Sequence, residues 1–268
     1  RAGLRPFGSS RTQHFLGVGD APAAFRKEAL EVAEALGRVF LKHLASRGLP
    51  VAFPSDRMMV VVLKDAHSYS ALVGESPSQS VGGHFDLDAD RLVVFDFRPG
   101  RDDAGEAERI NTFTLVHETA HLLTFNTGLL STRADPGKAI TEGLATYFEM
   151  WRRTSRAPIG GLNRPRLMAI RDELRDGGEL LPLARLLTED ALFDDPKTAQ
   201  LAYGQAWLLM HHLLSSRSLW PNVAAYFAGL KAGPAPDRVA KLAEHIGSIA
   251  TLADRLRRDG RSMIRDLR

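Results

Sequence analysis

A short apolar segment at positions 114–123 contains two histidines, Thr-Leu-Val-His-Glu-Thr-Ala-His-Leu-Leu, and limits the folds open to this chain. On an α-helix, residues four apart lie on one face, so the imidazoles of His117 and His121 can share a single metal ion. Glu118 is rotated by about 100° from His117 and lies beside the metal position rather than on it. The alternative, a surface helix with two exposed histidines, conflicts with the apolar residues on both sides.

A catalytic zinc site usually takes three protein ligands and one water, so a third ligand must come from elsewhere in the chain. The chain has no cysteine, which leaves His, Asp and Glu as ligands. A second apolar segment, 139–149, carries Glu142 near its start. Gly128 and Pro136-Gly137 provide a turn and a loop before it. The sequence therefore predicts two antiparallel helices that hold a metal between His117, His121 and Glu142.

The hydrophobic pattern before this helix pair predicts a small sheet. Apolar, β-branched runs at 58–63 and 91–97 indicate strands, and helical spacing is seen over 22–46 and 66–73. From Asn111, the expected N-cap of the HExxH helix, the pattern is helical almost to the end. The expected helices cover 111–126, 140–153, 163–175, 198–215, 219–230, 235–246 and a last one from 249.

This arrangement predicts an α+β fold with a small N-terminal sheet and a mostly helical C-terminal half. Residues 1–20, rich in Gly, Ser and Arg, are expected to form an extended lead-in. No linker divides the remainder, so we expect one domain over 21–268, with 163–268 as a possible helical subdomain.

Charge and hydropathy exclude two classes of partner. The formal net charge is +3 without a long block of like charge, which argues against a nucleic-acid-binding protein. No run approaches 18 consecutive apolar residues, so no transmembrane segment is expected. The sequence leaves the oligomeric state open.

An HExxH motif followed about 20 residues later by Glu142 in the setting Glu-Gly-Leu-Ala-Thr-Tyr resembles the gluzincin metallopeptidases. More narrowly, the chain is similar to bacterial peptidase-MA-like proteins. The similarity covers roughly residues 58–215 and includes the turn at 82–86 and the segment 202–207, Ala-Tyr-Gly-Gln-Ala-Trp. It implies a fold in which the strand before the HExxH helix is the sheet edge that holds a peptide substrate.

The resemblance implies roles for residues outside the ligand set. Tyr203 would stabilise the oxyanion, although a core aromatic residue is the alternative. In thermolysin-like enzymes an aspartate four residues after the ligand glutamate supports a zinc-bound histidine, and this chain has Thr146 there, with Glu149 on the next turn as a substitute. The strand 92–97 would form the cleft wall. Its expected cleft residues are Val93, Val94 and Phe95, with His84 beside them unless it is a loop histidine without a role.

Together these observations predict a zinc-dependent hydrolase, with one Zn²⁺ per chain, a peptide or protein substrate and Glu118 as general base. The alternative is a module that binds zinc or a peptide without turnover on a degenerate peptidase fold. The resemblance, together with a chain that starts at Arg1 instead of Met, is compatible with export to the periplasm or the extracellular space, but the sequence leaves the compartment open.

Overall fold

The computed structural model describes residues 7–77, 82–99, 102–154, 158–175, 177–233 and 236–267. The fold is α+β, as the sequence predicts, with a five-stranded N-terminal sheet and a mostly helical remainder. Contacts group the chain into two compact units. The first contains Arg1–Lys42, Ala52–Thr127 and Trp151–Ala157, and the second contains His43–Val51, Gly128–Met150 and Pro158–Arg268. A single domain was expected from the sequence.

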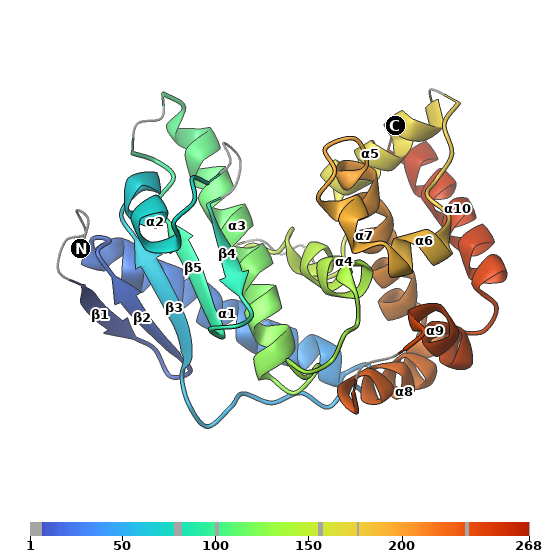
Figure 1. Cartoon of the computed structure of the whole chain (residues 1–268), viewed down its shortest axis with the longest axis horizontal. Coiled ribbons are helices and arrows are strands. Elements are labelled where there is room, and N and C mark those ends of the chain that lie inside the picture. Colours follow the sequence, from blue (N-terminus) through green and yellow to red (C-terminus); the bar gives the residue numbers. More distant parts are fainter. Residues whose placement is uncertain are drawn as a thin grey trace. The chain divides into compact units, whose positions relative to one another are not determined.

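The first unit is built on a mixed sheet with the strand order β1-β2-β3-β5-β4 (Figure 1). The strands are β1 (Gly8–Arg11), β2 (Phe15–Gly19), β3 (Met58–Leu63), β4 (Gly83–Asp86) and β5 (Arg91–Phe95). The pairs β2·β3 and β3·β5 are parallel, whereas β1·β2 and β4·β5 are antiparallel. β2 requires a glycine where it passes β3, because a Cβ on Gly19 would lie 1.9 Å from the carbonyl oxygen of Val62.

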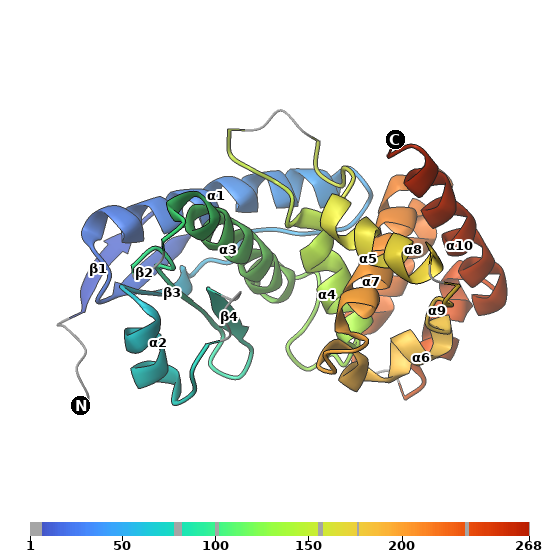
Figure 2. The same ribbon diagram turned by 90° about the horizontal axis from the view of Figure 1, so that it is seen from above.

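Helices cover both faces of this sheet. The long helices α1 (Ala23–Ala45) and α3 (Ala104–Asn126) lie on one face, and the short helix α2 (Ala66–Val73) lies on the other (Figure 2). α2 packs its Tyr69 and Leu72 against a cluster that includes Val61, Val93 and Phe95. Side chains alternate along a strand, so β5 presents Val93 to α2 and Leu92 to the opposite face.

The sequence-based prediction for the N-terminus was wrong in part. Residues expected to form a lead-in outside the domain instead form β1 and β2, and Phe15 in β2 is fully buried. The strands were missed because they are short and rich in glycine and serine, which have low strand propensity. Residues 1–6 of the expected lead-in lie outside the described residues.

The predicted sheet edge was also wrong. The strand expected to form the edge, 91–97, corresponds to β5, which pairs with β3 on one side and β4 on the other. The edge is β4, a four-residue strand in the segment that was expected to be a turn. The expected cleft residues Val93, Val94 and Phe95 are at most 4% exposed, so they belong to the core.

The second unit consists of helices, and α7 lies at its centre. Its elements are α4 (Lys138–Phe148), α5 (Arg164–Arg175), α6 (Leu183–Thr188), the 3₁₀ turns Asp190–Phe193 and Arg217–Leu219, α7 (Ala199–Ser215), α8 (Trp220–Lys231), α9 (Arg238–Ile246) and α10 (Ile249–Arg265). Most residues of α7 are buried, including Trp207 and Met210, and α4 and α5 pack against it. Across the part of the chain that the structure describes, no helix has both the length and the apolar character needed to cross a membrane.

Candidate metal centre

α3 carries both histidines and starts earlier than the sequence predicts. Asp103 is the N-cap, and its Oδ1 accepts a hydrogen bond from the backbone N–H of Glu106 at 2.9 Å. The expected cap, Asn111, lies inside the helix, where its Oδ1 accepts from the backbone N–H of Phe97 at 2.8 Å. The first turns were missed because they are exposed and lack an apolar period. The helix ends as predicted before Gly128, which has a positive φ of 83°.

His117 and His121 converge on a single point. Both are buried, with 8% of each residue exposed, and their Nε2 atoms are 3.3 Å apart. Two nitrogen ligands at about 2.0–2.1 Å from a tetrahedral zinc ion are themselves about 3.3 Å apart. The spacing of the two ring nitrogens therefore matches that of two ligands of one metal ion.

Glu142 completes a group that could bind a metal ion. One ligand atom each from His117, His121 and Glu142 lies within 4.8 Å of the others, and both histidines are buried while Glu142 is half-buried. Glu142 is in the first half of α4, as predicted. The three ligands that the sequence predicts are thus brought together.

Glu118 is held by the backbone of the edge strand. The N–H of Phe85 in β4 donates a 2.8 Å hydrogen bond to Oε2 of Glu118. Phe85 is opposite Leu92 of β5, and its ring stacks on Phe125 of α3 at a centroid distance of 5.8 Å. One carboxylate oxygen is therefore fixed, and the carboxylate lies next to β4 rather than β5.

His84, the neighbour of Phe85, points to the opposite face of the sheet. It is a strand residue rather than a loop histidine, and its Nδ1 is 2.6 Å from the hydroxyl of Tyr69 in α2. Burial, followed by the negative charges of Glu118 and Glu75, raises the pKa of Tyr69 to about 12. Tyr69 therefore stays protonated and can donate to Nδ1, which leaves the proton of a neutral His84 on Nε2. No sequence pattern predicts this pair, because Tyr69 lies in α2 and His84 lies in β4.

The two residues that were expected to support the zinc-bound histidines have partners within the second unit. The hydroxyl of Thr146 is 2.7 Å from the carbonyl oxygen of Glu142 and 3.0 Å from that of Gly143, within its own helix. Glu149 is fully buried, and Arg166 donates to its two oxygens at 2.8 and 3.1 Å. Their proposed contact with the histidines stays a prediction.

Tyr203 lies in the first turns of α7, where its ring contacts Arg166 and Phe193. The guanidinium carbon of Arg166 lies 4.7 Å from the centre of its ring, and the ring of Phe193 meets it edge-on at 5.3 Å. The tyrosine is half-buried. Arg166 was missed in the sequence because it lies in a polar helix start with no recognisable spacing to Tyr203.

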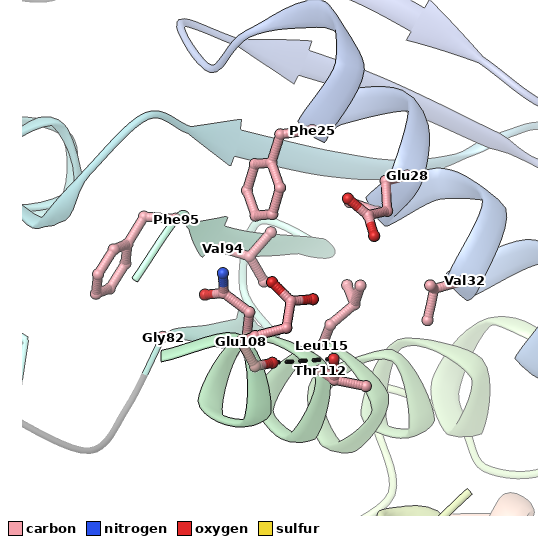
Figure 3. A pocket seen from close by; sticks show the side chains of 11 residues that line it. Phe25, Glu28, Val32, Gly82, Val94, Phe95, Glu108, Thr112 and Leu115 are labelled. Atoms are coloured by element: carbon pink, nitrogen blue, oxygen red, sulfur yellow. Dashed lines mark hydrogen bonds between the residues drawn. The ribbon is translucent and has the colours of Figure 1, made fainter. Parts of the chain in front are cut away.

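A hollow between α1 and α3 is distinct from this site (Figure 3). Phe25 and Glu28 of α1 face Glu108, Thr112 and Leu115 of α3 across it. At about 100° per residue, His117 and His121 lie on the opposite side of α3 from these three residues. The hollow is therefore not the cleft of the candidate metal centre.

The candidate ligands lie in a part of the chain that matches a protein-family model. The model of a family described as a protein of unknown function (DUF1570) matches residues 111–225. The matched region includes His117, Glu118, His121, Glu142 and Tyr203. A comparison with curated proteins finds no match.

Proposed function

We propose that this protein is a zinc-dependent hydrolase, and specifically a metallopeptidase of the gluzincin type. His117, His121 and Glu142 hold the zinc ion, and Glu118 is the general base. The observation that carries the proposal is the 3.3 Å approach of two buried histidine nitrogens on the helix that also presents Glu118. Two structural histidines would reach this distance only if one Nε2–H donated to the other Nε2, and that alternative leaves the approach of Glu142 to the same point unexplained.

The residues fit zinc in kind and number. Two imidazole nitrogens and one carboxylate oxygen form the ligand set of many catalytic zinc sites, which keep a fourth position open for water or substrate. The chain has no thiolate that could form a closed structural site with four sulfur ligands. A three-ligand centre therefore favours a catalytic role over a structural one.

When bound, zinc supplies a Lewis acid for the scissile carbonyl and lowers the pKa of a water molecule towards about 7. With zinc bound, Glu118 would accept a proton from that water and later deliver it to the leaving amine. The hydrogen bond from the N–H of Phe85 engages Oε2 of Glu118 and leaves Oε1 to accept the proton. The hydroxyl of Tyr203 donates a hydrogen bond to the developing negative charge.

The edge strand supports a peptide as the substrate. β4 pairs on one side with β5, and Glu118 uses the outward-facing N–H of Phe85. Peptides bind to such edges through main-chain hydrogen bonds, so the peptide-holding role first expected of β5 belongs to β4. The substrate backbone then runs next to the general base.

The substitution Glu118→Gln tests this proposal. The probe is a library of internally quenched peptides, with metal content measured on the same preparations and Glu108→Gln as the control on the opposite side of α3. We expect Glu118→Gln to keep its zinc and lose at least a thousandfold in turnover, whereas Glu108→Gln behaves like the wild type. A zinc-loaded wild type that cleaves no peptide of the library would contradict hydrolysis and favour the non-catalytic binding module.

A further inference from the structure

Glu149 and Arg166 form a buried ion pair whose geometry is unusually well defined. Nε of Arg166 donates to Oε1 of Glu149 at 2.8 Å, and Nη2 donates to Oε2 at 3.1 Å. The Glu149 side chain is fully buried, and that of Arg166 is 11% exposed. Two parallel hydrogen bonds fix both the position and the plane of the guanidinium group.

Asn163 reinforces this pair from the start of α5. Its Nδ2 donates to Oε1 of Glu149 and to the carbonyl oxygen of Thr146, the latter at 3.0 Å. Its Oδ1 accepts from the backbone N–H of Arg166 at 3.3 Å. The end of α4 and the start of α5 are thus tied together around the carboxylate of Glu149.

The fixed guanidinium lies over the ring of Tyr203. Its central carbon is 4.7 Å from the ring centre, within the distance at which a cation and an aromatic face attract each other. Phe193 meets the same ring edge-on, at 5.3 Å and an interplanar angle of 83°. Gly204 lets α7 pack closely against the start of α5, because a Cβ there would lie 2.7 Å from the backbone carbonyl oxygen of Arg166.

Tyr203 is close in sequence to the residues of α7 that pack against α4. α4 and α7 meet where Gly143 faces Ala206, since a Cβ on Gly143 would lie 2.7 Å from the carbonyl oxygen of Ala206. Glu142 directly precedes Gly143, and Tyr203 lies one turn before Ala206. Glu142 and Tyr203 therefore flank one helix–helix contact within the second unit.

We propose that Arg166, held by Glu149, is a positioning residue that fixes the ring of Tyr203 and keeps a positive charge on its face. The inference rests on the proposed function, in which the hydroxyl of Tyr203 donates to developing negative charge. A cation over the ring favours the phenolate over the phenol, so the hydroxyl becomes a stronger hydrogen-bond donor. A fixed ring also holds the Tyr203 hydroxyl in the orientation for donation before the reaction begins, so no reorganisation is needed.

The alternative is that the ion pair only ties α4 to α5. Buried ion pairs are weak evidence for stability, because the desolvation of both charges offsets their attraction. If the pair were purely structural, removing the positive charge of Arg166 would leave the titration of Tyr203 unchanged. A matched control exists in α6, where Arg185 donates to both oxygens of Glu189 at 2.7 Å and, among the described residues, contacts no aromatic ring.

The first measurement uses the full chain with ¹³Cζ-labelled tyrosine and needs no substrate. The chain has four tyrosines, and burial raises the pKa of Tyr69, Tyr147 and Tyr226, so the Tyr203 resonance can be assigned with Tyr203→Phe and followed alone. We expect Arg166→Met to move the Tyr203 titration up by about one pH unit, and Arg185→Met to leave it in place. An unchanged titration in folded Arg166→Met would overturn the proposal.

A second variant covers the case in which Arg166→Met does not fold. In ¹⁵N-arginine-labelled protein, the side-chain resonance of Arg166 should shift between wild type and Tyr203→Leu, because the ring current is removed. The absence of such a shift would overturn the contact directly.

The kinetic measurement separates this inference from the proposed function. With a peptide that the zinc-loaded wild type cleaves, Arg166→Met should lower kcat at least tenfold, with KM and zinc content nearly unchanged and with Arg185→Met as the control. An unchanged kcat in a variant whose Tyr203 titration has moved would overturn the positioning role. If the wild type cleaves no peptide, the proposed function fails, while the titration still shows whether Arg166 acts on Tyr203.

Discussion

The backbone N–H of Phe85 in β4 donates a 2.8 Å hydrogen bond to Oε2 of Glu118 in α3. A backbone donor cannot rotate away, so the bond fixes the carboxylate relative to the sheet edge. The same bond shows that this N–H faces away from β5 and takes no part in the ladder. The orientation of the candidate base therefore depends on a group that is invisible in the sequence pattern.

This bond can be removed with little damage to the sheet. Phe85→Pro deletes the N–H at an edge position that proline tolerates, and Phe85→Ala removes the ring but keeps the N–H. We expect Phe85→Pro to lower peptide turnover about tenfold relative to Phe85→Ala, since hydrogen bonds to charged groups contribute about 1.5–3 kcal/mol. Equal turnover in the two variants would show that the bond does not orient Glu118.

The close packing of α4 on α7 predicts a large effect for a small change. In Gly143→Ala the new methyl would lie 2.7 Å from the carbonyl oxygen of Ala206 and 2.8 Å from Cγ of Met210. We expect a loss of about 2–3 kcal/mol in the free energy of unfolding, together with weaker metal binding through Glu142. Urea unfolding and metal titration provide the measurement. Gly105→Ala, in the exposed first turn of α3, should be neutral or slightly stabilising, and a similar loss there would refute the packing argument.

His43 predicts acid sensitivity of the second unit. Burial, assisted by the charge of Arg47, lowers the pKa of His43 to about 3, and its Nε2 lies 2.9 Å from the hydroxyl of Tyr147. The unfolded chain takes up this proton near pH 6.5, whereas the folded chain does not until about pH 3. The stability that depends on neutral His43 is therefore complete above pH 6.5 and is lost as the pH falls towards 3.

The expected size of this effect is about 1 kcal/mol between pH 7 and pH 5, reduced from the full linkage because the ring is partly in contact with solvent. Urea unfolding of wild type and His43→Gln at both pH values gives the comparison. The stability difference between the two proteins should change by this amount in favour of the variant at pH 5. If the free energies of unfolding of the two proteins changed equally with pH, the lowered pKa of His43 would be excluded as the cause of acid sensitivity.

Breaking the buried ion pair should destabilise the protein more than removing it. Glu149→Ala leaves the guanidinium of Arg166 buried without its carboxylate, which costs about 3–5 kcal/mol. The double variant Glu149→Met, Arg166→Met should recover most of this loss, because neither charge remains. Guanidinium unfolding of the single and double variants measures the coupling. Additive losses would mean that the two side chains do not depend on each other.

Local periodicity predicted much of the fold. The strand at 58–63 and the helix at 66–73 were predicted with their observed bounds, and most helices of the second unit to within three residues. The failures have physical causes. β1 is polar, β2 is interrupted by two glycines, and β4 is short, so pairing with neighbours rather than propensity makes these segments strands.

The candidate site also contains residues that the sequence predicted and residues that it did not. His117 and His121 follow from a spacing of four on one helix, and Glu142 from a second apolar segment with a carboxylate. Contacts between distant segments carry no such signal. The pairing of Tyr69 with His84, and that of Arg166 with Glu149 and Tyr203, depend on tertiary packing, so they were not predicted.

The metal content of the purified chain shows directly whether His117, His121 and Glu142 hold a zinc ion. Wild type, His117→Ala, Glu142→Ala and the control His212→Ala would be prepared without chelators, incubated with zinc, desalted and analysed by elemental analysis. We expect about one zinc ion per chain in wild type and His212→Ala, and a loss of bound zinc in His117→Ala and Glu142→Ala. A wild type that retains no zinc, or variants that retain as much as the wild type, would contradict the metal centre.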